Sequence, residues 1–242
     1  MDLKIVGKTA LVVGASKGIG RAVVEELHAA GCRVIAVARD EALLGTLDCE
    51  WRYAVDLMQR DAVERLTFRI RNHPGIPEII YHAIGGSWCG IKATAEPAAR
   101  WAEVWRYNLG LAIDINNAFL PDMLKNRWGR IVHTSSDAVA HAIGNAPYAS
   151  AKFALEGYVK VVAKQYAKEN VIISAVSLGP IYREGGWLYD RPVDETRAYF
   201  DAYLPTRRFG TAAEAAKAVA FMCSEHSSFM AGSIVNVHGG SR

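Results

Sequence analysis

The sequence predicts an α/β fold in one domain, built on a doubly wound parallel sheet with helices on both faces. Three observations lead to this prediction. Short apolar runs alternate with longer stretches of helical periodicity, the pattern of parallel strands joined by helical crossovers. A glycine-rich turn follows the first apolar run. The 242 residues suffice for one large core, and no repeat or linker tract divides them, so we expect a single domain over 1–242.

The predicted strands are continuous apolar runs, as expected of strands that are buried on both faces. They are residues 9–13, 33–38, 51–55, 78–83, 130–134, 171–176 and 233–237. The predicted helices repeat apolar residues at intervals of three or four. They are residues 20–30, 61–71, 97–120, 121–126, 148–168 and 211–224. Because ligands of such sheets bind at the carboxyl ends of the strands, we expect the functional residues directly after them.

The composition is that of an ordinary globular protein, with 51% hydrophobic and 22% charged residues. A net charge of +3 with no long Lys/Arg run gives no indication of nucleic-acid binding. No apolar run is long enough to span a bilayer, and the N-terminus lacks the pattern of a signal peptide. The cysteines Cys32, Cys49, Cys89 and Cys223 are scattered without metal-ligand spacing. We therefore expect a cytoplasmic protein with free thiols, no metal and no membrane partner.

Gly14, Gly18 and Gly20 form a turn between the first predicted strand and the first helix. Glycine allows the chain to reverse tightly, to approach a pyrophosphate and to pack the helix against its strand. The N–H groups at the helix start can then bind phosphate. The strand before and the helix after are the context that makes such a turn a dinucleotide site rather than a tight turn that binds nothing. We also expect Ser16, Lys17 and Ile19 of this turn to contact the cofactor.

The second predicted strand ends at Arg39, and Lys17 lies inside the glycine turn. A carboxylate at the end of this strand selects NAD, whereas an arginine accommodates the 2′-phosphate of NADP. Two cations beside the adenosine ribose therefore favour NADP(H). Asp40 leaves an alternative open, because a shift of one residue would place a carboxylate near the ribose.

Tyr148 and Lys152 are four residues apart in a predicted helix and so share one face. An ammonium beside a phenol favours the phenolate and lowers the pKa of the tyrosine toward working pH. Such a tyrosine can donate a proton to a forming alkoxide or remove one from an alcohol. Upstream, Ser135 and Ser136 end a predicted strand, where a hydroxyl can bind a carbonyl oxygen, and Asn108 lies in a helical segment.

The glycine turn, Asn108, Ser136, Tyr148 and Lys152 follow in this order, and the turn has the spacing Gly-x3-Gly-x-Gly. In these features the chain resembles the short-chain dehydrogenase/reductase family, and is similar to its 3-oxoacyl-carrier-protein reductases. The resemblance extends to residues 235–240 and so covers nearly the whole chain. It implies a Rossmann fold, catalysis by these four side chains, and a dimer or tetramer in which residues 97–120 and 148–168 form subunit interfaces.

By this resemblance, Asn108 holds a water that connects Lys152 to solvent as a proton relay, and Lys152 also binds the nicotinamide ribose. Asp56 touches the adenine amino group, although it could equally cap the following helix. The remaining expected cofactor contacts are Leu57, Ala83, Gly85, Tyr148, Gly179 and Ile181. Which serine acts stays open: alignment by the strand selects Ser136, whereas the interval to Tyr148 selects Ser135. We favour Ser136, with a one-residue deletion in the loop 137–147.

The chain departs from the family pattern at two strand ends. Residues 81–86 read Tyr-His-Ala-Ile-Gly-Gly where the family has Asn-Asn-Ala-Gly, so both side-chain amides are absent. This stretch is similar to the enoyl-reductase branch, which however spaces its tyrosine and lysine further apart. We interpret His82 as structural. Leu178 and Arg183 stand where the family has a proline and a threonine, which leaves Ile181 only backbone groups for the nicotinamide carboxamide.

Residues 183–208 are expected to form a substrate lid. Its aromatic and basic side chains, together with Trp88, predict an apolar pocket with a cationic rim, or else aromatics that only pack on the core. They are Trp187, Leu188, Tyr189, Tyr199, Phe200, Tyr203, Arg183, Arg191 and Arg197. The leading hypothesis is an NADPH-dependent reductase of a small-molecule ketone, or the reverse alcohol oxidation. The alternatives are a 3-oxoacyl-carrier-protein reductase of fatty-acid synthesis and a non-catalytic NADP-binding sensor.

Overall fold

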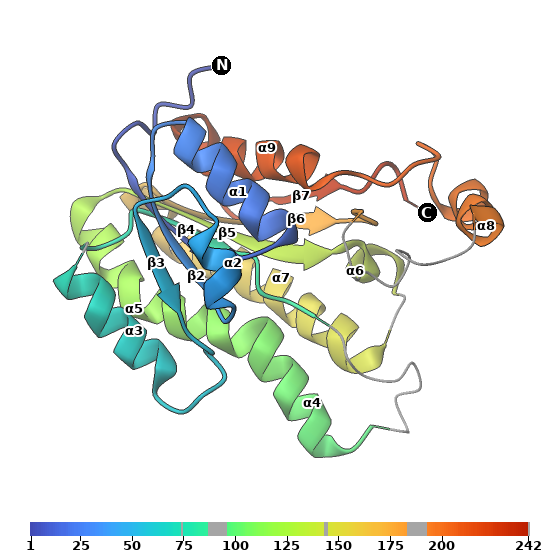
Figure 1. Ribbon diagram of the computed structural model, residues 1–242, viewed down its shortest axis with the longest axis horizontal. Helices are drawn as coiled ribbons and strands as arrows, with labels where there is room; N and C mark the ends of the chain where they lie inside the picture. Colours follow the sequence, from blue (N-terminus) through green and yellow to red (C-terminus); the bar gives the residue numbers. More distant parts are fainter. Residues whose placement is uncertain (74, 87–95, 143–144, 183–192, 242) are drawn as a thin grey trace.

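A seven-stranded sheet forms the centre of the computed structural model, which describes residues 1–73, 75–86, 96–142, 145–182 and 193–241 (Figure 1). The strands are arranged in the order β3-β2-β1-β4-β5-β6-β7, and all neighbouring pairs are parallel. They are β1 (Thr9–Val13), β2 (Arg33–Ala38), β3 (Trp51–Ala54), β4 (Ile79–His82), β5 (Gly129–Ser136), β6 (Val171–Leu178) and β7 (Ile234–Val237). The predicted doubly wound sheet is confirmed.

The strand order reverses between β1 and β4, the position where doubly wound sheets bind their ligands. The chain moves outward from β1 to β3 on one side and from β4 to β7 on the other. β5 and β6 extend two residues beyond their predicted ends, with Ser135 opposite Ser177 and Ser136 opposite Leu178. This longer pairing carries the two serines into the sheet at its carboxyl edge.

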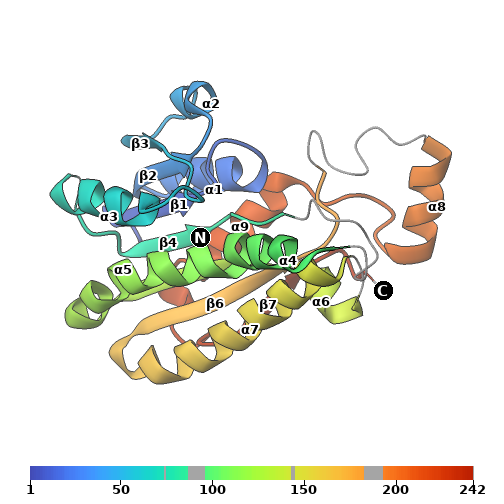
Figure 2. The same ribbon diagram turned by 90° about the horizontal axis from the view of Figure 1, so that it is seen from below.

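Helices cover both faces of the sheet, and each face has its own apolar core (Figures 1 and 2). On one face lie α1 (Gly18–Ala29) and α9 (Ala212–Met222). Thr211 and Glu214 form a reciprocal capping box at the start of α9. On the other lie α3 (Ala62–Asn72), α5 (Leu111–Asn126) and α7 (Ala146–Tyr166). Short 3-10 turns follow α7 (Ala167–Glu169) and α9 (Glu225–Ser227).

The helical stretch after β4 is divided differently from the prediction, which placed a boundary at Pro121. In the structure α4 (Ala98–Trp105) leads into a π turn (Arg106–Gly110), and α5 then continues through Pro121. A proline costs the helix one hydrogen bond and some strain. Buried side chains on either side of it, such as Phe119 and Met123, hold the helix against the sheet and outweigh that cost.

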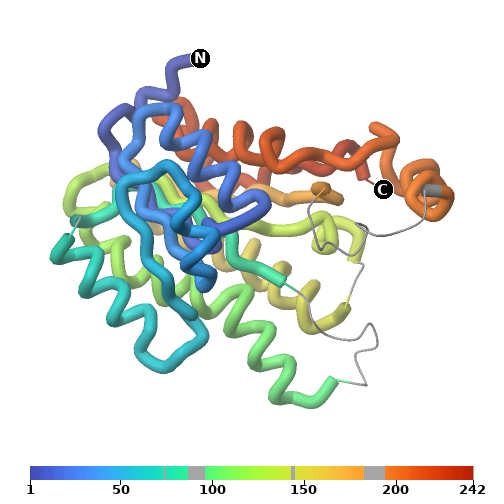
Figure 3. Tube along the Cα trace, viewed as in Figure 1, coloured from blue at the N-terminus to red at the C-terminus, as the bar shows by residue number. Residues whose placement is uncertain are grey.

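Three short helices were not predicted: α2 (Glu41–Gly45), α6 (Asp137–His141) and α8 (Val193–Tyr203). Each of the first two begins with a side-chain cap, from Asp40 and Ser136 respectively. With 5 residues each, these two are too short to show a clear apolar period. The last described residue lies beside α6 (Figure 3), where Ser241 Oγ is 3.3 Å from Nε2 of His141.

Candidate active site

The turn between β1 and α1 leaves no room for a side chain at Gly14 or Gly20. A Cβ on Gly20 would clash with the carbonyl oxygen of Gly14, and one on Gly14 would lie 3.0 Å from the carbonyl carbon of Ala83. Gly14 and Gly18 have φ angles of +90° and +56°, which other residues rarely adopt. Lys17 precedes α1 without making a side-chain cap. The first N–H groups of α1 are thus available to a phosphate, and the turn fits the pyrophosphate of a dinucleotide.

The residues expected near the adenosine surround this turn. Ser16 is buried, Ile19 is half-buried, and both Lys17 and Arg39 are exposed. Asp40, the competing residue at the end of β2, caps α2: its Oδ1 accepts a hydrogen bond of 3.0 Å from Leu43 N. That bond holds the Asp40 side chain toward the start of α2, so Arg39 is the better candidate to meet the ribose substituent. The pair of exposed cations fits a 2′-phosphate.

Asp56 and Leu57 follow β3, as expected. Asp56 Oδ1 accepts a hydrogen bond of 3.1 Å from Met58 N in a tight turn. It is not the cap of the next helix, since the residue that precedes α3 is Asp61. Leu57 is buried in the core below the turn. The side chain of Asp56 therefore stays at the carboxyl edge of the sheet, where an adenine contact is expected.

Tyr148 and Lys152 lie in the first two turns of α7. Asn145 caps this helix by accepting a hydrogen bond of 2.9 Å from Tyr148 N, and Pro147 starts the first turn. This cap fixes where the helix begins and so places Tyr148 at its third position. Lys152 follows one turn later, and its Nζ lies 5.7 Å from the centroid of the Tyr148 ring. Lys152 Nζ thus lies on the side of α7 that carries the Tyr148 ring.

Lys152 is held inside the protein although it can carry a charge. It is 1% exposed, and its Nζ donates a hydrogen bond of 2.7 Å to the carbonyl oxygen of Thr134 on β5. Burial lowers the pKa of Lys152 to about 7. Both protonation states are therefore populated near neutral pH, which suits a group that passes protons.

Asn108 lies in the π turn, where it is 2% exposed. Its Nδ2 donates hydrogen bonds of 2.9 Å to the carbonyl oxygens of Gly86 and Val104, and its Oδ1 accepts one of 3.1 Å from Gly86 N. Such turns are frequent at functional sites. A Cβ on Gly85 would lie 2.9 Å from Lys152 Nζ and 3.2 Å from Asn108 Oδ1, so both side chains converge on Gly85.

The two serines at the end of β5 have different partners. Ser135 Oγ donates a hydrogen bond of 2.6 Å to Glu156 Oε1 on α7. Ser136 lies two residues beyond Thr134, accepts a hydrogen bond of 3.2 Å from Ala138 N and donates a long one of 3.4 Å to Asp137 Oδ1. Because the bond from Ser135 to its carboxylate is 0.8 Å shorter than the bond from Ser136, the hydroxyl of Ser136 is the easier one to redirect and the better candidate to meet a substrate.

The remaining expected cofactor residues follow β4 and β6. Ala83 N donates a hydrogen bond of 2.8 Å to Val13 O, which holds the β4 end against the glycine turn. A Cβ on Gly179 would clash with His238, so only glycine fits between β6 and the end of β7. Ile181 pairs with Gly210 in an isolated bridge. These contacts place the three backbones along one edge of the sheet.

Two polar clusters were missed by sequence reasoning. His133 and Asn116 connect to His82 in the interior, and His82 is the satisfied structural histidine that was expected. The only signal for His133 was a polar residue in an apolar strand. The other cluster borders Ser136: His141 lies beside Ser241, whose N–H donates to His238 at 3.1 Å. Nothing in the sequence connects residues a hundred positions apart.

Much of the expected lid lies outside the described residues, and so does Trp88. The unplaced lid residues are Arg183, Trp187, Leu188, Tyr189 and Arg191. In the described part, Phe200 of α8 contacts Phe209 edge-on with ring centroids 4.7 Å apart, and Tyr199 lies 5.2 Å from Tyr203. These aromatic rings therefore pack on one another.

Among the described residues, no helix has both the length and the apolar character to cross a membrane. No group of three or more His, Cys, Asp or Glu side chains in the same part of the chain is arranged to hold a metal ion.

The chain matches a family model and several known proteins over nearly its whole length. The model, described as enoyl-(acyl carrier protein) reductase, covers residues 14–242. The 3-oxoacyl-[acyl-carrier-protein] reductase FabG of Aquifex aeolicus (strain VF5) is 30% identical over 99% of each chain. The 3-oxoacyl-[acyl-carrier-protein] reductase MabA of Mycobacterium avium is 33% identical over 97% of this chain and 90% of its own.

Solved structures share the fold. The L-sorbose reductase of Gluconobacter frateurii, in complex with NADPH and L-sorbose, has a TM-score of 0.90 over 99% of this chain and 98% of that one, at 23% identity. The glycine turn, the Tyr148–Lys152 pair and these end-to-end matches agree. The chain belongs to the short-chain dehydrogenase/reductase family of oxidoreductases, as its resemblance predicted.

Proposed function

We propose that this protein is an NADPH-dependent reductase that converts a ketone to an alcohol, with Tyr148 as the proton donor. The observation that carries the proposal is the position of Lys152. Its buried Nζ is bonded to Thr134 O and lies 5.7 Å from the centre of the Tyr148 ring. An ammonium there stabilises the phenolate that remains after the proton has left.

The side chains divide the remaining tasks. Bound NADPH supplies the hydride. Ser136 donates a hydrogen bond to the carbonyl oxygen of the substrate, and Tyr148 gives its phenolic proton to the same oxygen as the alkoxide forms. Lys152 then returns a proton to the phenolate. Asn108, fixed on both sides by Gly86 and Val104, supports the route by which Lys152 is reprotonated. The reverse sequence oxidises an alcohol.

NADP(H) is the proposed cofactor. The glycine turn fits a pyrophosphate, and the exposed Lys17 and Arg39 fit a 2′-phosphate. The L-sorbose reductase of the same fold was solved with NADPH. The proposed cofactor contacts also include Asp56, Ala83, Gly85, Gly179 and Ile181 along the carboxyl edge.

The decisive experiment follows the loss of NADPH absorbance with a panel of ketones, quinones and an acetoacetyl thioester. We expect turnover with at least one carbonyl, and a loss of at least a hundredfold in kcat for Tyr148→Phe. Phe keeps the ring and removes only the hydroxyl. Turnover unaffected by this change would eliminate Tyr148 as proton donor. Tight NADPH binding without any turnover would instead favour the non-catalytic sensor.

A second candidate is a 3-oxoacyl-carrier-protein reductase. It is favoured by the names of relatives that are 30–33% identical over nearly the whole chain. The test compares three kinds of substrate: an acetoacetyl thioester of an acyl carrier protein, an acetoacetyl thioester of a small thiol, and free ketones. A kcat/KM at least a hundredfold higher for the carrier-bound substrate would establish this candidate. Equal values would favour a reductase of free ketones.

We further propose a homodimer or homotetramer that assembles through α4 and α7. Apolar side chains on these helices remain exposed: Phe153 by 48%, Val161 by 58% and Trp105 by 39%. Such residues on neighbouring helices are typical of a face that another subunit covers. Light scattering coupled to size-exclusion chromatography should give a mass of two or four chains, and Val161→Glu should reduce it.

A further inference from the structure

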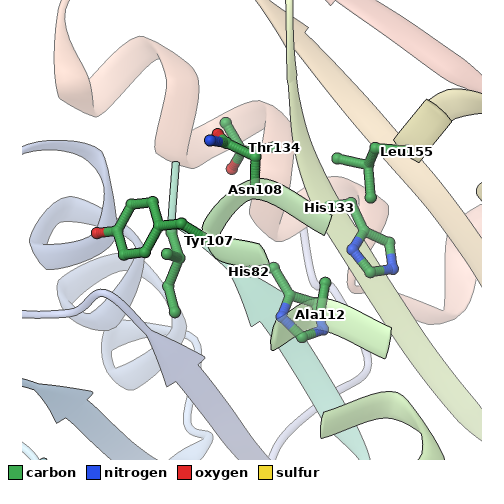
Figure 4. A pocket seen from close by; sticks show the side chains of 8 residues that line it. His82, Tyr107, Asn108, Ala112, His133, Thr134 and Leu155 are labelled. Atoms are coloured by element: carbon green, nitrogen blue, oxygen red, sulfur yellow. The ribbon is translucent and has the colours of Figure 1, made fainter. Parts of the chain in front are cut away.

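A small cavity lies next to the Lys152 site, between the ends of β4 and β5 and the π turn. His82, Asn108, His133 and Thr134 are among its lining residues (Figure 4). About 10 Å³ of it is open to the centre of a water molecule, which is the space that one water needs. Two of these residues also belong to the Lys152 site: Thr134 O binds Lys152 Nζ, and Asn108 Oδ1 converges with it on Gly85.

A buried amide connects the two histidines that border the cavity. Their rings stack in parallel, with centroids 4.5 Å apart and planes 1° from parallel. Asn116 Oδ1 lies 2.8 Å from His82 Nε2, and Asn116 Nδ2 lies 3.2 Å from His133 Nε2. Asn116 Nδ2 also donates a hydrogen bond of 3.0 Å to the hydroxyl of Tyr158. Both histidines and Asn116 are at most 3% exposed.

These contacts determine where the hydrogens lie. An amide oxygen only accepts, so His82 donates from Nε2; an amide nitrogen only donates, so His133 accepts at Nε2. Burial lowers the pKa of His82 to about 4 and that of His133 well below its usual value, and both rings are neutral. A neutral ring with a bare Nε2 carries its hydrogen on Nδ1.

His133 Nδ1 is therefore a buried donor, and it has no hydrogen-bond partner within the described residues. Leaving such a group unpaired is costly, and ordered water usually satisfies it. The cavity offers acceptors for the hydrogens of that water. Asn108 Oδ1 has accepted one bond, and the carbonyl oxygen of Thr134, which accepts from Lys152 Nζ, has a second lone pair.

We propose that one water occupies this cavity, held by His133 Nδ1, and that His133 thereby acts as a positioning residue for Lys152. The water accepts the hydrogen of Nδ1 and donates to Asn108 and Thr134, the two residues that border the ammonium. In the described structure Lys152 has only neutral partners, so the orientation of these dipoles governs how easily it regains a proton. The role of the water in turnover depends on the proposed function; its presence does not.

Two substitutions test the two ring nitrogens of His133 independently. The amide of His133→Asn reaches the position of Nδ1, whereas that of His133→Gln reaches the position of Nε2 and can still bind Asn116. In a high-resolution crystal structure of the NADPH complex, we expect a water within 3.2 Å of His133 Nδ1. We expect the water to remain in His133→Asn and to be absent from His133→Gln.

The kinetic expectation follows the same division. His133→Asn should keep kcat within about twofold, whereas His133→Gln should lower it about tenfold, part of what a proton-transfer group contributes. The KM for NADPH should not change, and only His133→Gln should shift the limb of the pH–kcat profile that reports Lys152. If His133 were merely structural, both substitutions would change kcat alike and neither would shift the pH–kcat profile.

Each result decides the proposal. A dry cavity in the wild-type crystal overturns it, and so do equal pH profiles for the two variants. If neither variant folds, Ala112→Val fills the cavity from α5; unchanged kcat there overturns the positioning role, and a tenfold loss together with loss of the water supports it. If wild-type protein reduces no carbonyl, the proposed function fails, while the crystal structure still decides whether His133 holds a water.

Discussion

The hydroxyl of Ser135 donates a hydrogen bond of 2.6 Å to the carboxylate of Glu156, which joins the end of strand β5 to the middle of α7. This bond fastens the strand that carries Thr134 to the helix that carries Lys152. We therefore propose separate tasks for the two neighbouring serines: Ser135 holds the two elements together, and Ser136 meets the substrate.

Replacing each serine by alanine should therefore have opposite signatures. Ser136→Ala should lower kcat about a hundredfold and change the Tm little, because a hydroxyl that binds the reacting oxygen is lost. Ser135→Ala should leave Glu156 without this partner and lower the free energy of unfolding by about 1–2 kcal/mol, with kcat within a few-fold. Steady-state kinetics and thermal unfolding of both variants check this. The reverse pattern would assign catalysis to Ser135.

Lys152 should destabilise the cofactor-free protein. Its pKa is about 7 in the folded state and near 10.5 in the unfolded chain, so between these values the unfolded chain binds more protons. Stability then increases as the pH rises through this window, and the full cost of the ammonium applies below pH 7. Lys152→Met should raise the free energy of unfolding by about 2 kcal/mol at pH 6, and less at pH 9.5, while abolishing turnover.

Thermal unfolding at the two pH values measures this difference. The exposed Lys125 at the end of α5 provides a matched control, since Lys125→Met should leave the Tm unchanged at both. A stabilisation of the same size at pH 6 and pH 9.5 would show that the effect does not come from the buried charge.

Arg39 should determine the choice between the two dinucleotides. Arg39→Asp should raise the KM for NADPH by about tenfold to a hundredfold, since a charge-assisted bond is lost and a repulsive carboxylate replaces it. The KM for NADH should fall or stay the same. Lys125→Asp makes an identical change of charge at the opposite edge of the sheet and should alter neither value. If both substitutions changed the KM for NADPH equally, Arg39 would act only through the long-range electrostatic field and not through a direct contact.

Gly85 should tolerate no side chain without loss of activity. A Cβ there would push against Lys152 Nζ at 2.9 Å and Asn108 Oδ1 at 3.2 Å. Because the lysine end is flexible, we expect Gly85→Ala to fold normally and to lower kcat about tenfold through misplacement of the ammonium. Gly45→Ala, at the end of α2 where nothing lies within 4 Å, is the matched control for both stability and rate. A fully active Gly85→Ala would indicate that Lys152 can shift freely.

The sequence predicted the seven strands and the long helices because burial on both faces produces apolar runs that need no tertiary information. It located the ends of β5 and β6 less well. Their last residues are serine and leucine in a polar context, and only the pairing of Ser136 with Leu178 shows that the strand continues. The choice between the serines depended on that end, which is why it stayed open.

The glycine turn and the Tyr148–Lys152 pair could be predicted because their members are close in the sequence. The His82–Asn116–His133 contacts could not, since they join two strands and a helix across the core. The caps of the short helices were also missed: Asp40 and Ser136 each had a functional interpretation that drew attention from their hydrogen bonds to the following turn.

The π turn at Arg106–Gly110 has a consequence for changes of chain length. A π turn contains one residue more than an α turn, and each residue of a helix rotates the chain by about 100°. Because the extra residue is taken up within a single turn, deleting one residue here would restore a regular helix and keep α4 in phase with α5, but it would shift the residues of the turn itself, Asn108 among them. A homologous helix without the extra residue would therefore preserve the packing of α4 and α5 but would not hold the side chain of Asn108 in its present place.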